Sequence, residues 1–229
     1  MAIHGQTKNQ YRALRAMAIE SWELRSNQPI DEITPDSISH NQKKNDWPSL
    51  NTRICNCTAC DLHVHRIQAV CGAGNVNADC LIIGEAPGAE EDGKGEPFVG
   101  PAGMLLNEML SSIGLDRNVV FVANILKCRP PQNRDPSLTE IAKCLPYLEE
   151  QIALIDPKLI IAVGRIAAQS LLNSNQAIGR MRGEIYQYGK NHIPLVVTYH
   201  PAYLLRSPAQ KAKSWNDLLL AHNILNQVN

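Results

Sequence analysis

Residues 80–88 read CLIIGEAPG, a short apolar run that ends at a glycine and passes into a polar turn. An apolar run of this length, without polar alternation, is typical of a strand covered on both faces of a sheet. Similar runs recur at 119–123, 159–163 and 195–198. Helix-like stretches separate or follow them, at about 102–113, 137–155, 165–173 and 208–227. This alternation predicts an α/β fold, a three-layer sandwich around a central, mostly parallel four-stranded sheet.

The rest of the chain divides at about residue 50. Residues 9–25 are predicted to form a helix, and residues 26–50 are polar and aperiodic. We therefore interpret residues 1–50 as an N-terminal extension and linker, and residues 51–229 as the compact domain. The 22 Lys and Arg residues balance 22 Asp and Glu residues, and 44% of the chain is hydrophobic, which excludes an intrinsically disordered protein. No apolar run approaches the length of about 20 residues that spans a bilayer, so no membrane contact and a cytoplasmic location are expected.

Polar side chains follow each predicted strand. Glu85 comes after the first strand, Asn124 after the second, Gly164 and Arg165 after the third, and His200 after the fourth. Ligands of parallel sheets bind at this carboxyl edge, so these side chains are expected to share a site. The turn at 84–88 lacks the G-x-G-x-x-G spacing of dinucleotide-binding proteins, which argues against a nucleotide cofactor.

Seven unevenly spaced cysteines form a poor disulfide framework for a cytosolic protein. Cys57 and Cys60 have C-x2-C spacing, and Cys128 and Cys144 lie further along the domain. Four such thiolates bind either zinc or an iron–sulfur cluster, whereas a cysteine taken singly is more often a buried free thiol. Cys55, two residues before Cys57, leaves the choice of ligands open. The remaining two are expected to be structural: Cys71 and Cys80.

Several motifs occur together along the domain. They are GEAPG at 84–88 with ED at 91–92, PFVG at 97–100, Asn124 with KCRPP at 127–131, and HPAYLLR at 200–206. In combination they resemble the iron–sulfur uracil-DNA glycosylases of family 4, and the likeness runs from about Cys57 to the C-terminus. The resemblance implies a [4Fe-4S] cluster and a protein of the bacterial or archaeal cytosol. It also implies the cluster ligands, which exclude Cys55: Cys57, Cys60, Cys128 and Cys144.

The resemblance implies an enzyme that flips uracil out of single- or double-stranded DNA and hydrolyses its N-glycosidic bond, leaving an abasic site. Phe98 would stack on the flipped base, and Asn124 would pair with its O4 and N3–H groups. Glu91 would lie beside C5, where it would exclude the methyl group of thymine.

Catalysis, on this resemblance, depends on three side chains: Glu85, Asn124 and His200. His200 would donate a hydrogen bond to O2 of the departing uracil, where negative charge collects. Glu85 would stabilise the sugar cation and orient the attacking water. The backbone N–H groups of the turn from Gly84 to Ala86 would assist.

The DNA itself is expected to meet other residues. Leu204 and Leu205 are candidates for a wedge that fills the vacated stack, and Arg206 would bind a phosphate. Gly100 opens a helix whose N-terminus is predicted to hold another phosphate. The protein is expected to be a monomer, and residues 1–50 suggest contact with a replication or repair protein.

Three other functions are open at this point. One is a relative that traps uracil covalently, but such proteins carry a basic, His-containing insertion near the third ligand cysteine, and the run from Cys128 to Arg134 lacks it. Another is an iron–sulfur module for uracil-DNA binding or electron transfer without turnover. The third is a zinc-binding nucleic-acid adaptor.

Overall fold

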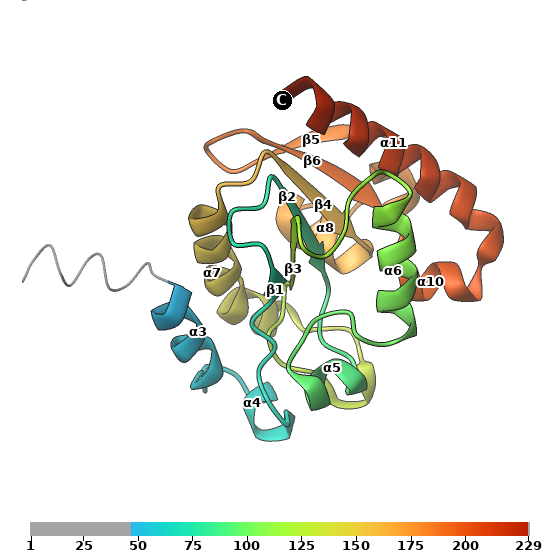
Figure 1. Cartoon of the computed structure of the whole chain (residues 1–229). Coiled ribbons are helices and arrows are strands. Elements are labelled where there is room, and N and C mark those ends of the chain that lie inside the picture. The colour runs from blue at the N-terminus through green and yellow to red at the C-terminus, as the bar shows by residue number, and fades with distance from the viewer. Residues whose placement is uncertain (1–46, 229) are drawn as a thin grey trace, which may run out of the picture. The chain divides into compact units, whose positions relative to one another are not determined.

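The computed structural model describes residues 47–228, and in this part of the chain six strands form one sheet (Figure 1). The strands are β1 (Ala73–Gly74), β2 (Cys80–Gly84), β3 (Val120–Asn124), β4 (Leu159–Val163), β5 (Ile185–Tyr188) and β6 (Ile193–Thr198). Their order across the sheet is β1-β3-β2-β4-β6-β5. The four central strands are parallel, whereas β1 pairs antiparallel with β3 and β5 pairs antiparallel with β6. All four parallel strands therefore end at the same edge.

Helices surround this sheet in the described part of the chain. They are α3 (Trp47–Cys55), α4 (Leu62–His65), α5 (Ala89–Lys94), α6 (Pro101–Ser111), α7 (Leu138–Ile155), α8 (Arg165–Leu172), α9 (Ile178–Met181), α10 (Pro201–Arg206) and α11 (Lys211–Val228). Short 3-10 turns occupy Pro131–Asn133 and Pro208–Gln210. Ser137 caps α7, because its hydroxyl accepts from the N–H of Glu140 while the Glu140 carboxylate accepts from the N–H of Ser137.

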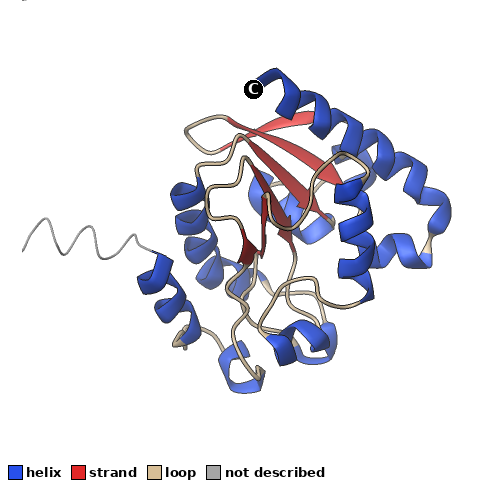
Figure 2. Ribbon diagram, viewed as in Figure 1, coloured by secondary structure: helices blue, strands red, loops and turns tan. Residues whose placement is uncertain are grey.

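The sheet forms the middle of three layers, with helices on both sides (Figure 2). Successive residues of each strand point to opposite faces. In β2, Leu81 and Ile83 pack towards α7 and α8, whereas Cys80 and Ile82 pack towards α6 and α11. Because both faces are covered, every residue of β2, β3 and β4 is buried. Continuous apolar runs in the sequence thus become central strands.

The predicted fold class is confirmed. The four predicted strands are the four central ones, and the helices predicted at 102–113, 137–155, 165–173 and 208–227 begin and end within a few residues of α6, α7, α8 and α11. The sequence reasoning missed the two edge strands. β1 has only two residues, and β5 alternates between exposed and half-buried positions, so neither has a continuous apolar run.

The helix α3 lies partly in the stretch that we expected to be irregular. It begins at Trp47, and its Leu50 and Ile54 are fully buried beside Ala69 and Tyr147. The helix predicted at 9–25 lies outside the described residues. Among residues 47–228, none of the helices combines the length and apolar content needed to cross a bilayer.

Candidate active site

A cleft of about 720 Å³ opens at the carboxyl edge of the parallel strands. Residues that follow all four central strands contribute to its walls. Among them are most of the residues predicted from the sequence: Glu85, Ala86, Glu91, Phe98, Asn124, His200 and Arg206. Gly84 borders this group, and Gly100, Leu204 and Leu205 are not among the lining residues. The structure therefore places the aromatic ring, the carboxamide and the imidazole around one cavity.

Glycine at position 84 allows this convergence. A Cβ atom there would lie 2.4 Å from Oδ1 of Asn124 and 2.6 Å from Cζ of Phe98. Any side chain would occupy the space in which the amide and the ring meet. Gly164, at the end of β4, has φ +101°, and a Cβ atom there would lie 3.1 Å from Cβ of His200. Both glycines keep the cleft open.

Asn124 presents an unpaired acceptor to the cleft. The residue is 2% exposed, and its Oδ1 atom has no hydrogen-bond partner within the described protein. Buried polar atoms in proteins are nearly always hydrogen-bonded, so an orphaned acceptor in a cleft indicates a site for a ligand donor.

His200 is a neutral hydrogen-bond donor. Its Nδ1 atom accepts from the main-chain N–H of Ala202 at 3.1 Å, so the ring proton resides on Nε2. Burial, assisted by the positive charge of Arg206 and opposed by Glu91, lowers the pKa of His200 to about 4. The ring also stacks on Phe98, with a centroid separation of 5.5 Å.

The pKa of Glu85 is shifted upwards, whereas that of His200 is shifted downwards. Burial, assisted by the negative charge of Asp135 and opposed by Arg165, raises the pKa of Glu85 to about 6. Arg165 and Asp135 are themselves joined by an ion pair. Near neutral pH the carboxylate of Glu85 is therefore charged, but close to the point at which it takes up a proton.

Glu91 holds the loop that carries Phe98. Its Oε1 atom accepts from the N–H groups of Val99 at 3.0 Å and Gly100 at 3.2 Å, and its Oε2 atom accepts from the N–H of Gly88 at 3.1 Å. Phe98 has φ +55°, an uncommon conformation for a residue with a side chain. Two of these amides, those of Val99 and Gly100, directly follow Phe98, and their hydrogen bonds to Glu91 help the loop keep this strained conformation.

Comparison with known proteins connects this geometry to a family. The profile of the uracil DNA glycosylase superfamily matches residues 71–219. A type-4 uracil-DNA glycosylase of Pyrobaculum aerophilum is 44% identical over 181 residues, which cover 76% of this chain and 92% of the relative. Type-4 enzymes of Archaeoglobus fulgidus and Thermotoga maritima are 45% and 41% identical over 171 and 167 residues, each covering 72% of this chain and 85% of the relative. The chain belongs to the type-4 uracil-DNA glycosylases.

Membership of this family makes the protein a hydrolase that excises uracil from DNA in DNA repair. One of the DNA contacts predicted for the glycosylase needs correction. Leu204 is 1% exposed and packs against Met109, Ile113 and Leu218, so it cannot enter a base stack without leaving the core. Leu205, its neighbour on α10, is 45% exposed and remains the candidate wedge.

The predicted phosphate contact at Gly100 stays a prediction, and the structure shows what surrounds it. The residue is buried, and its N–H already donates to the Glu91 carboxylate. This carboxylate lies at the N-terminus of α6, where a phosphate was expected to bind. A phosphate at this helix end would approach the negative charge of Glu91, which disfavours the predicted contact.

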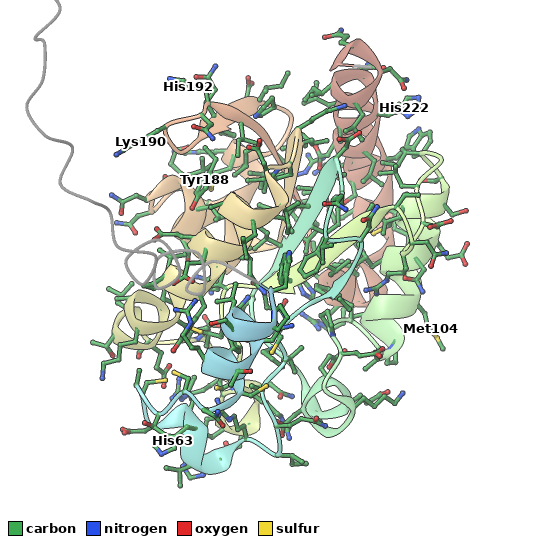
Figure 3. All side chains as sticks on the ribbon, turned by 60° about the vertical axis from the view of Figure 1, so that its left-hand side comes forward. His63, Met104, Tyr188, Lys190, His192 and His222 are labelled. Atoms are coloured by element: carbon green, nitrogen blue, oxygen red, sulfur yellow. The ribbon has the colours of Figure 1, made fainter. Side chains whose placement is uncertain are left out.

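The four predicted ligand cysteines of the glycosylase line a second, smaller cavity: Cys57, Cys60, Cys128 and Cys144. Arg66 donates from Nη1 to the Sγ atom of Cys128 at 2.9 Å, and the N–H of Lys127 donates to Sγ of Cys144 at 3.3 Å. Figure 3 shows His63 on α4, in the segment that follows the C-x2-C pair. Cys55 is exposed and is not among the lining residues.

Two charged residues lie near Glu85: Asp135 and Arg165. Arg165 follows β4 after Gly164 and lines the cleft, as its place after the third predicted strand indicated, whereas sequence reasoning gave Asp135 no role. Asp135 lies in the connection between β3 and α7, and only its ion pair with Arg165 brings it near Glu85. No local motif indicates that contact.

Proposed function

We propose that the glycosylase holds a flipped uracil in the 720 Å³ cleft and cleaves its N-glycosidic bond with Glu85, Asn124 and His200. One observation carries this proposal. An orphaned buried acceptor on Asn124 and a neutral imidazole donor on His200 face one cavity together with the ring of Phe98. These groups match the donor, the acceptor and the flat face of a pyrimidine.

Base selection follows from the same groups. Asn124 accepts from N3–H of uracil and donates to O4, whereas cytosine presents the opposite pattern at these two atoms. Phe98 stacks on the base. Glu91, fixed by three amide hydrogen bonds, lies beside C5 and blocks the methyl group of thymine. A rigid carboxylate excludes that methyl group better than a mobile one.

Bond cleavage leaves a uracil anion and an oxocarbenium-like sugar. His200 donates from Nε2 to O2 as negative charge develops, assisted by the main-chain N–H groups of Gly84 and Ala86. Because the pKa of His200 is lowered to about 4, the imidazole is neutral near pH 7 and stabilises the anion as a hydrogen-bond donor through Nε2. The carboxylate of Glu85 stabilises the sugar cation and orients water towards it.

DNA would be held by α10, which follows the catalytic histidine. Leu205 is the exposed apolar side chain that enters the vacated stack, and Arg206, exposed at the cleft, binds a phosphate. We also propose that the protein is monomeric and acts in the cytosol, where it meets nucleoid DNA. The proposal of a repair or replication partner concerns residues 1–50, of which 1–46 lie outside the described residues.

The cysteine cavity fits a [4Fe-4S] cluster better than zinc. Thiolates about 2.3 Å from a zinc ion would lie only about 3.8 Å from one another. Within residues 47–228, no three His, Cys, Asp or Glu side chains are close enough to hold a single metal ion, although four thiols line the cavity. Cys57, Cys60, Cys128 and Cys144 would hold the cluster, and their four thiolate bonds would link the irregular segments that carry them.

An oligonucleotide assay tests the proposed function. A single-stranded oligonucleotide with one uracil is incubated with the glycosylase and then treated with alkali, which breaks the strand at an abasic site. We expect a break at the uracil and none at cytosine or thymine. His200→Ala and Asn124→Ala should each lower the single-turnover rate about 100-fold or more, as loss of preorganised donors does in other enzymes. An intact strand, or a stable protein–DNA adduct, would favour binding without turnover.

A further inference from the structure

Lys127 is a fully buried lysine between β3 and α7, and it is 1% exposed. Its Nζ atom donates to the main-chain carbonyl of Asn124 at 2.8 Å and to Oε1 of Gln151 at 2.6 Å. Both acceptors are neutral. Lysine normally keeps its amine in water, and burying a charge beside neutral groups is unfavourable. Packing alone would be served better by an apolar side chain, so the hydrogen bonds indicate a specific task.

The same residue also contacts the cysteine cavity. Its main-chain N–H donates to Sγ of Cys144, and its carbonyl accepts from the N–H of Val70 at 2.8 Å. Gln151 lies two turns after Cys144 on α7, and its Nε2 atom donates to the carbonyl of Cys71. Lys127 thus links the end of β3 to helix α7, which carries Cys144 and Gln151. It also links β3 to the segment of Val70 and Cys71.

Asn124 needs such support. Its Oδ1 atom has no hydrogen-bond partner in the described protein, so no hydrogen bond to that atom fixes the orientation of the carboxamide. The direction of the carboxamide therefore depends on its packing beside Gly84 and on the position of the main chain at the end of β3. That main chain is held on one side by the N–H of Ile125, which donates to the carbonyl of Gly84 at 2.9 Å, and on the other by Lys127 Nζ.

We propose that Lys127 is a positioning residue for uracil recognition, because its Nζ atom holds the Asn124 main chain so that the carboxamide points into the cleft. The inference rests on the proposed role of Asn124. It assigns Lys127 no contact with the substrate. Removal of the Nζ atom would let the strand end relax, and the amide would lose its alignment with O4 and N3–H of uracil.

A double-mutant cycle between Lys127→Met and Asn124→Ala tests the proposal. Methionine keeps most of the side-chain volume and removes both hydrogen bonds. We expect Lys127→Met to lower kcat/KM on the uracil oligonucleotide at least about tenfold, the effect of losing a hydrogen bond to a charged group. It should weaken inhibition by free uracil to a similar degree. The double variant should be no slower than Asn124→Ala alone, because the two changes remove one shared interaction.

Lys190→Met is the control for loss of a lysine. Lys190 is exposed between β5 and β6 and is not among the lining residues of either cavity, so kcat/KM of this variant should stay within about twofold of the parent. If Lys127→Met does not fold, Gln151→Met replaces it in the cycle, because it removes one acceptor of Nζ and leaves the lysine in place.

The outcomes separate the two claims. Full activity of Asn124→Ala would contradict the proposed function itself. Two other results would contradict only the role of Lys127, provided that Asn124→Ala itself lowers kcat/KM. One is unchanged kcat/KM in Lys127→Met. The other is a double variant in which the two losses of kcat/KM multiply. Iron content that falls in parallel with activity in the Lys127 and Gln151 variants would also overturn it, because the defect would then lie in the cofactor site.

Discussion

His200 and Glu85 face one cleft but ionise in different pH ranges. Burial favours the neutral form of each, which lowers the pKa of the imidazole to about 4 and raises that of the carboxyl to about 6. Between these values His200 is already a neutral donor, whereas Glu85 is still mostly protonated. Above about pH 6 both groups are in the forms that the proposed mechanism needs.

The pH profile should therefore have one acid limb near pH 6, set by Glu85. Protonation removes the negative charge that stabilises the sugar cation, so kcat/KM should fall as the pH drops through that value. Asp135→Asn removes a charge that raises the pKa of Glu85, and the limb should move to lower pH. Arg165→Gln removes the opposing charge and should move it to higher pH. Single-turnover rates from pH 4.5 to 8 measure both shifts. If neither variant moves the acid limb of the profile, a group other than Glu85 sets it.

Helix α6 positions Phe98 through close backbone contact. A Cβ atom at Gly103 would lie 1.7 Å from the carbonyl oxygen of Phe98, so only glycine lets this turn of the helix approach the loop. The Glu91 carboxylate holds the same loop at the N-terminus of the helix. The position of the Phe98 ring is thus set by contacts that Gly103 and Glu91 make with the backbone of its loop.

Gly103→Ala should disturb this arrangement. Alanine usually stabilises a helix relative to glycine, but here the clash with backbone should lower the free energy of unfolding by about 1–3 kcal/mol and reduce activity. Gly93→Ala in α5 is the control, because a Cβ atom there has no neighbour within 4 Å. It should raise stability by up to about 1 kcal/mol. Urea unfolding measures both, and equal stability of the two variants would show that α6 can shift.

At the scale of the whole molecule, residues 47–228 combine a well-packed sheet with a less regular region around the cysteines. The central strands are buried on both faces, whereas the segment between α3 and β1 contains only the four-residue helix α4. Hydrophobic burial therefore holds the first region, and the second needs additional links. Arg66 and Lys127 supply two such links through their hydrogen bonds to Cys128 and Cys144, and the proposed cluster would supply others.

Loss of a cluster ligand should accordingly affect the whole protein. Cys128→Ser should lose the brown colour, the bound iron and much of the thermal stability, because thiolate bonds no longer join the loop after β3 to the C-x2-C segment. Cys55→Ser should retain all three, since this exposed thiol is not a proposed ligand. Visible absorption, iron analysis and thermal unfolding provide the measurements. Four irons retained in Cys128→Ser would show that the ligand set is wrong.

Hydrophobic runs and strand-end residues in the sequence were enough to predict the central sheet and the edge at which Glu85, Asn124 and His200 meet. Such patterns are local in the sequence. Because the four central strands are parallel, the residues at their carboxyl ends lie at one edge of the sheet. Tertiary structure alone decided that Leu204 is buried while Leu205 is exposed, that the Gly100 N–H is already bonded to Glu91, and that Lys127 Nζ donates to the Asn124 carbonyl. These properties depend on contacts between segments distant in sequence, and no local periodicity encodes such contacts.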